Sequence, residues 1–182
     1  TTQVRAITAT NLAALNETQV GAFTATQLQA LTNTNLAALV DTQIAALTDT
    51  QVANLSSTQV GALTATNVAA FTTNQAAALT ATQLALLTGA NVHALADTQI
   101  AAMDTTQIKA FTAAQLASLD ATDMSEFAAT QVAALTTTQV GALSNTNFAA
   151  LADTQVEALT TTQLTAVSAA KIIEVDVVFQ KD

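Results

Sequence analysis

The chain has no cysteine, proline, tryptophan or tyrosine, and only four of its 182 residues are lysine or arginine. Without cysteine it can form neither a disulfide nor a thiolate metal site. A net charge of −9 disfavours binding to nucleic acid and to anionic membrane surfaces. No run of about 18 apolar residues occurs, so no insertion into a membrane is predicted. No basic segment followed by an apolar one indicates a signal peptide.

What the chain has in abundance is one eight-residue phrase. From Thr8 to Val175 it reads Thr-x-x-Gln-(Val/Ile/Leu)-x-Ala-Leu, and this segment divides into 21 octads with no insertion or deletion. We number the positions of each octad from 1 (Thr) to 8 (Leu). Repeats of this length bury an apolar core only by stacking on one another. We therefore expect residues 1–170 to form one linear repeat domain.

Within each octad, Thr at position 1 and Gln at position 4 have the spacing of a helix N-terminal capping box. The apolar positions 5 and 8 are three residues apart and share one helical face. One continuous helix is disfavoured, because eight residues advance about 80° beyond two turns and the apolar positions would spiral around it. A β-solenoid is disfavoured because the octad lacks alternation. The prediction is an all-α solenoid with one capped helix of about two turns per octad. The caps singled out are Thr24/Gln27, Thr48/Gln51, Thr80/Gln83, Thr136/Gln139 and Thr160/Gln163.

A longer period of seven octads lies within the repeat. Asn replaces the position-4 Gln at Asn35, Asn91 and Asn147, each seven octads after the one before. This predicts three super-repeats, 8–63, 64–119 and 120–175. Two explanations stay open: a superhelix that returns to the same azimuth every 3.5 octads, or duplication without geometric meaning.

The last residues depart from the octad pattern. Residues 171–182 are rich in β-branched residues, which predicts a short strand. This strand would be either a cap on the end of the array or the start of a following domain.

No catalytic residue, cofactor or metal ligand is predicted. His93, the single histidine, is expected to be a surface residue, and Asp120, Asp123 and Glu126 a solvated acidic cluster. The many hydroxyls have no His–Asp pair to activate them. Other residues are given structural roles: acids at position 2 in the first helical turn (Asp41, Asp49, Asp97, Asp153) and aromatic core residues at position 8 (Phe23, Phe71, Phe111, Phe127).

The segment Leu-Thr-Thr-Thr-Gln-Val-Gly-Ala-Leu (135–143) resembles octapeptide-repeat regions of very large secreted bacterial proteins, of the kinds called adhesin-like, haem-utilisation-like or RTX-type. The resemblance extends from Thr1 to about Ala170. It implies an extracellular, surface-attached stalk, although the sequence offers no haem ligand set.

The function expected from these features is a non-enzymatic structural spacer, with flanking domains of the same chain as neighbours. Three alternatives are weighed against it. The first is a solenoid that binds a protein or glycan, such as a host or cell-surface ligand. Its binding face would gather charged or aromatic residues at the variable position 6, but those found there are scattered (Arg5, Gln29, His93, Lys109, Glu157). The second is end-to-end assembly into filaments. The third is ice binding by rows of position-3 threonines (Thr10, Thr18, Thr26, Thr34, Thr42, Thr50).

Overall fold

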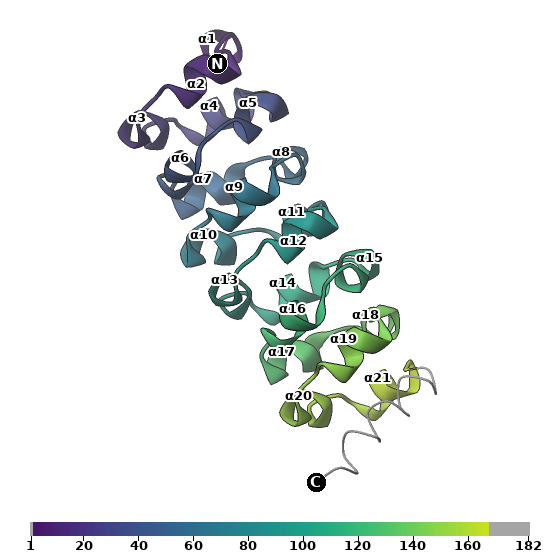
Figure 1. Ribbon diagram of the computed structural model, residues 1–182. Helices are drawn as coiled ribbons and strands as arrows, with labels where there is room; N and C mark the ends of the chain where they lie inside the picture. Colours follow the sequence, from purple (N-terminus) through teal and green to yellow (C-terminus); the bar gives the residue numbers. More distant parts are fainter. Residues whose placement is uncertain (1, 168–182) are drawn as a thin grey trace.

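The computed structural model describes residues 2–167, and in this part of the chain the protein is a row of short α-helices joined by tight bends (Figure 1). The helices are α1 Thr2–Arg5, α2 Ala9–Ala13, α3 Glu17–Gly21, α4 Ala25–Ala30, α5 Asn33–Ala37, α6 Asp41–Ala45, α7 Asp49–Asn54, α8 Ser57–Gly61, α9 Ala65–Ala69, α10 Thr73–Ala77, α11 Ala81–Ala85, α12 Gly89–His93, α13 Asp97–Ala101, α14 Thr105–Ala110, α15 Ala113–Ala117, α16 Ala121–Ser125, α17 Ala129–Ala134, α18 Thr137–Ala142, α19 Asn145–Ala149, α20 Asp153–Glu157 and α21 Thr161–Thr165. The predicted all-α array with one helix per octad is confirmed. Within residues 2–167 there is no strand, and the strand predicted for 171–182 lies outside the described residues.

From α2 onward each helix begins directly after position 1, which is its N-cap: that residue is extended, and in most octads its side chain accepts a hydrogen bond from the helix. In the five boxes singled out above, the Thr hydroxyl lies 3.2–3.3 Å from the Gln backbone nitrogen. The Gln Oε1 in turn accepts from the Thr backbone N–H at 2.6–2.8 Å. Two of the donors that a helix start leaves unpaired are thereby satisfied.

Four helices begin with no side-chain acceptor at the N-cap, because position 1 is Val40, Ala96, Ala128 or Ala152. There the backbone N–H of position 4 bonds the position-1 carbonyl at 2.9 Å. The position-4 amide still accepts from the position-1 N–H at 2.7–3.0 Å. A side-chain cap at position 1 is therefore not required for a helix to begin. Conversely, the position-4 side chain completes no capping box at Asn11, Asn35, Asn91 and Asn147, so neither half of the box is present in every octad.

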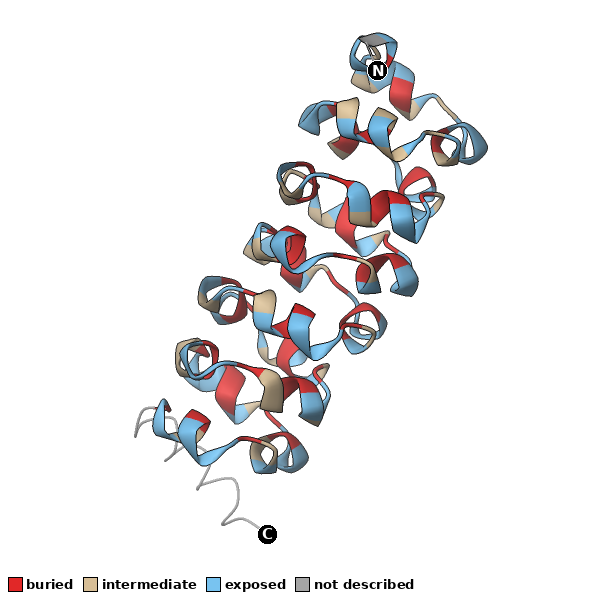
Figure 2. Ribbon diagram, turned by 180° about the vertical axis from the view of Figure 1, so that it is seen from behind, coloured by how far each residue is buried: buried red, intermediate tan, exposed pale blue. Residues whose placement is uncertain are grey.

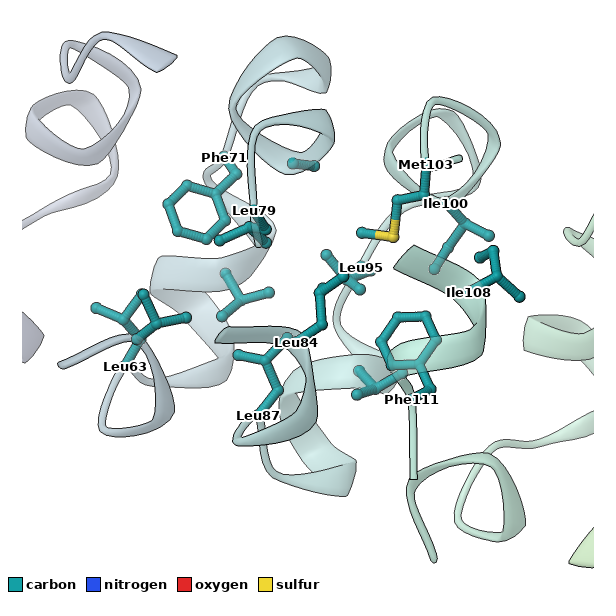
Figure 3. Close-up of a cluster of buried hydrophobic side chains, with 14 of the residues drawn as sticks. Leu63, Phe71, Leu79, Leu84, Leu87, Leu95, Ile100, Met103, Ile108 and Phe111 are labelled. Carbon is teal, nitrogen blue, oxygen red and sulfur yellow. The ribbon is translucent and has the colours of Figure 1, made fainter. Parts of the chain in front are cut away.

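Positions 5 and 8 form one apolar core that runs the length of the described chain. Each helix packs against the third helix before and after it, as α11 does against α8 and α14. Every helix consequently has a buried side and an exposed side (Figure 2). In the middle of the array, side chains from successive octads converge, among them Leu63, Phe71, Leu87, Leu95 and Met103 (Figure 3). Of the predicted aromatic core residues, three are buried and Phe23 is partly buried against the core.

The position-4 amide also bonds a part of the chain three and a half octads earlier, which the local sequence pattern does not predict. Its nitrogen donates to the backbone carbonyl of the residue 28 positions earlier, as Gln43 Nε2 does to the Leu15 carbonyl at 2.6 Å. Most glutamines also bond a carbonyl 30 or 31 positions back, as Gln83 does to Ala53 at 3.4 Å and to Val52 at 2.9 Å. The residues that donate across 28 positions are Asn35, Gln43, Gln51, Gln59, Asn67, Gln75, Gln83, Asn91, Gln99, Gln107, Gln115, Gln131, Gln139, Asn147, Gln155 and Gln163. We call this series the amide ladder.

Helix ends approach their neighbours closely at position 6. Gly61 lies so near α11 that a Cβ added to it would sit 2.7 Å from the carbonyl oxygen of Leu86. The equivalent atom on Gly141 would sit 3.2 Å from the Ala166 carbonyl oxygen. Small residues at position 6 therefore allow the close spacing of helices that the amide ladder requires.

Candidate functional site

Position 4 carries a carboxylate in place of an amide at Asp123, in α16, and this is where the amide ladder is interrupted. A carboxylate accepts hydrogen bonds but has no N–H to donate. The cross-layer contact is instead made from the other side, by His93 at the end of α12. His93 Nδ1 lies 2.7 Å from Asp123 Oδ2, across 30 positions of the chain. The histidine therefore acts as the donor that Asp123 lacks.

Asp120 and Asp123 form the capping box of α16. Asp120 Oδ1 accepts from the backbone N–H groups of Thr122 at 2.8 Å and of Asp123 at 3.1 Å. Asp123 Oδ2 accepts from the Asp120 backbone N–H at 2.7 Å. The side chain of Asp123 is only 10% exposed, whereas those of His93 and Asp120 are 55% and 57% exposed. His93 is thus a surface residue as expected, whereas the expectation of a solvated cluster is wrong for Asp123, which is buried beneath its contact with His93.

The charges of this cluster shift one another's protonation. The hydrogen bond to Asp123, and then the negative charge of that residue, raise the pKa of His93 above its ordinary value. The backbone N–H of Asp123 lowers the pKa of the Asp120 carboxyl. Burial raises the pKa of Glu126, and the neighbouring charges of Asp123 and Asp97 add to that effect. The cluster therefore holds more negative charge than its single histidine balances.

His93 Nδ1 and one carboxylate oxygen from each of Asp120 and Asp123 lie within 4.8 Å of one another. Three such donors are compatible with a divalent metal ion at the surface. Each atom already has a structural explanation, because the histidine nitrogen bonds Asp123 and both acids cap α16. Among the described residues no serine or threonine hydroxyl bonds His93. The arrangement is that of a contact between helices, with no activated nucleophile.

Shallow, open hollows lie between neighbouring helices of the described residues. One of about 430 Å³ lies between α13 and α16 and is lined by Asp97, Thr98, Ala101, Ser125 and Glu126. Among the described residues no helix is long and apolar enough to cross a membrane.

The sequence carries one signal for the amide ladder, which is the absence of glutamate at position 4. A capping box accepts Glu as readily as Gln at its fourth residue. Between Asn11 and Gln163, position 4 is nevertheless never Glu; it is Gln or Asn except at Asp123. That preference indicates that position 4 must supply an N–H donor. At the exception, Asp123, the chain's single histidine contacts the carboxylate.

No protein-family model, no curated protein and no solved structure matches the chain.

Proposed function

We propose that this chain is a structural spacer, a stiff rod that holds neighbouring domains apart without catalysing a reaction. The observation that carries the proposal is the continuity of its two bonding systems. One apolar core spans the described residues, and the amide ladder fastens each layer to the one before it from Asn35 to Gln163, with the contact between His93 and Asp123 in place of an amide bond at one octad. A solenoid bonded in this way resists bending because every layer contributes.

We infer further that one superhelical turn takes 3.5 octads. The hydrogen bonds across 28 positions and the packing of each helix on the third helix along support this pitch. Two turns then equal one seven-octad super-repeat, which favours the geometric explanation of that period. With layers about 9 Å apart, residues 8–167 form a rod of about 50 Å.

The setting we propose is outside a bacterial cell, on its surface or in a secreted protein. The acidic, cysteine-free, Thr- and Asn-rich composition supports it, as does the resemblance of the octad to repeats in large adhesin-like proteins. In that setting the partners are the flanking domains of the same chain.

The experiment that tests the rod is small-angle X-ray scattering on the chain and on a variant in which residues 64–119 are duplicated in tandem. Two added layers should lengthen the particle by about 18 Å while the cross-sectional radius stays the same. A scrambled insert of the same length and composition is the control, and it should increase the overall size without a defined length. A cross-section that grows with the true duplication contradicts the proposal.

Ice binding is the second candidate, because one specific feature favours it. The threonines at positions 1 and 3 are exposed along helices that carry no ionisable group, such as α4 and α18. Ordered hydroxyls on an uncharged surface could organise water. Measurement of thermal hysteresis and of ice recrystallisation decides the matter: freezing identical to that of a matched albumin solution excludes this function.

A further inference from the structure

The acidic residues are confined to part of the rod's circumference. Of the 13 acids in the chain, ten lie in the described residues. We define the acidic face as the nine of these that are exposed or partly exposed: Glu17, Asp41, Asp49, Asp97, Asp104, Asp120, Glu126, Asp153 and Glu157. They come from α3, α6, α7, α13, α20 and the caps of α14 and α16.

The two edges of the rod differ in charge. In Figure 1, α3, α6, α10, α13, α17 and α20 follow one another along the left edge, and four of them contain an acid. The opposite edge is formed by α5, α8, α11, α15 and α18, which contain no charged residue. Charge that served solubility alone would be needed on both edges. The uncharged edge is instead covered by Thr, Asn, Ser and Ala.

Within residues 2–167, ion pairs neutralise little of the acidic face. In the described residues the only ion pairs are those of His93 with Asp120 and Asp123. Lys109, in α14, forms none of them. The charge is densest around α16, where Asp97 and Glu126 line the same hollow and the charges of Asp123, Asp97 and Asp120 help to raise the Glu126 pKa. A cation placed there would relieve repulsion between carboxylates.

We propose that the acidic face binds a lysine- or arginine-rich polypeptide segment, which lies along the rod. This role goes beyond that of a spacer. Charge complementarity selects a basic partner and excludes nucleic acid and anionic lipid. The spread of the acids selects a polymer rather than a single ion, because Glu17 and Asp153 are 17 octads apart, nearly five turns of the proposed superhelix. At a layer spacing of about 9 Å that is about 45 Å, which an extended segment of about 14 residues covers.

The test uses the full chain and a fluorescent 16-residue peptide of alternating lysine and serine, with binding followed by anisotropy in 20 mM and 150 mM salt. One variant carries Asp41→Asn, Asp97→Asn and Asp153→Asn, which removes one acid from each super-repeat. The matched control carries Asn33→Lys, Thr137→Lys and Asn145→Lys on the uncharged helices α5, α18 and α19. Both variants change the net charge by the same three units and alter the same octad position.

We expect the chain to bind the peptide at low salt and to weaken as salt rises. Loss of three exposed ion pairs, each worth a factor of about two to five, should weaken binding by the acidic-face variant by about tenfold or more. The control should bind within about twofold to threefold of the parent chain. Equal weakening of both variants shows that net charge alone attracts the peptide and overturns the proposal. Failure of the parent chain to bind at 20 mM salt overturns it as well, and neither outcome bears on the length of the rod.

Discussion

Replacing one ladder amide by a carboxylate separates the two roles of the position-4 side chain, which accepts a capping hydrogen bond and donates one to an earlier part of the chain. In Gln83→Glu the new side chain has the same shape and keeps the acceptor that caps α11, since Gln83 Oε1 accepts from Thr80 at 2.7 Å. It loses the donor that bonds the Val52 and Leu55 carbonyls at 2.9 and 2.8 Å. Gln83 is 2% exposed, so water cannot replace these bonds.

The expected cost is about 3 kcal/mol of unfolding free energy at neutral pH. Two hydrogen bonds contribute about 1 kcal/mol each, and an acceptor facing two buried carbonyls adds about 1–3 kcal/mol, partly relieved by local rearrangement. The introduced carboxyl would have a raised pKa, because burial and the carbonyl dipoles disfavour its charge. Its destabilising effect should therefore shrink as the pH falls and the carboxyl gains a proton that it can donate.

Gln27→Glu is the matched control, because Gln27 caps α4 at 2.8 Å and lies before the ladder begins. It is expected to change stability by less than about 0.5 kcal/mol, and an acid in a first turn is electrostatically favourable. Denaturant titration followed by circular dichroism at pH 7.5 and pH 4.5 measures both variants. Equal effects of the two substitutions, or a Gln83→Glu effect independent of pH, would refute the argument that the donor is what position 4 supplies.

Three further predictions concern single contacts. The pKa of His93, measured by NMR titration, should lie above 6.5 in the parent chain and fall in Asp123→Asn. Because the folded pKa is raised, the stability that this pair contributes is present below pH 6.5 and is lost as the pH rises through the folded value. An unchanged titration of His93 in the variant contradicts the contact. Gly61→Ala should lower the melting temperature, at a cost of about 1–2 kcal/mol, despite the higher helix propensity of alanine, because the new Cβ would lie 2.7 Å from a backbone oxygen. Gly141→Ala, whose Cβ would lie 3.2 Å from a backbone oxygen, should be neutral or stabilising. The reverse order of the two melting temperatures would show that the close approach at Gly61 is unimportant. Val40→Thr supplies the hydroxyl cap that α6 lacks and should raise the unfolding free energy by about 0.5–1 kcal/mol, which calorimetry would register as a higher melting temperature.

Much of the architecture follows from short-range chemistry, and what does not follow depends on the pitch of the array. The capping box at Thr80/Gln83 and the apolar pair at positions 5 and 8 act within one octad, so the sequence predicts one helix per octad. The second partner of Gln83 is Leu55, more than three octads earlier in the chain, and its identity depends on how helices three apart pack. That packing is a sum over many side chains and cannot be read from one octad. The contact between His93 and Asp123 was missed for the same reason, because these residues belong to helices four octads apart.

The segregation of acids is a different case. Five of the nine acids stand at position 2 of their octads, and there Asp41, Asp97 and Asp153 have a sufficient local explanation in the helix dipole. Position 6 was the place where a binding surface was expected, and its residues are scattered. The acids are seen to share one side of the rod only when each octad is placed at its angle around the rod's long axis.

The ladder's step also bears on how such an array can break or grow. Twenty-eight is three and a half times eight, so the ladder bond joins position 4 of one octad to position 8 of an earlier one, where that octad meets the next. Separating one turn of the rod from the next therefore requires several of these hydrogen bonds to break at once. Every ladder bond joins position 4 to position 8, so the gain or loss of any number of whole octads keeps the same pairing, whereas the gain or loss of part of an octad would break it.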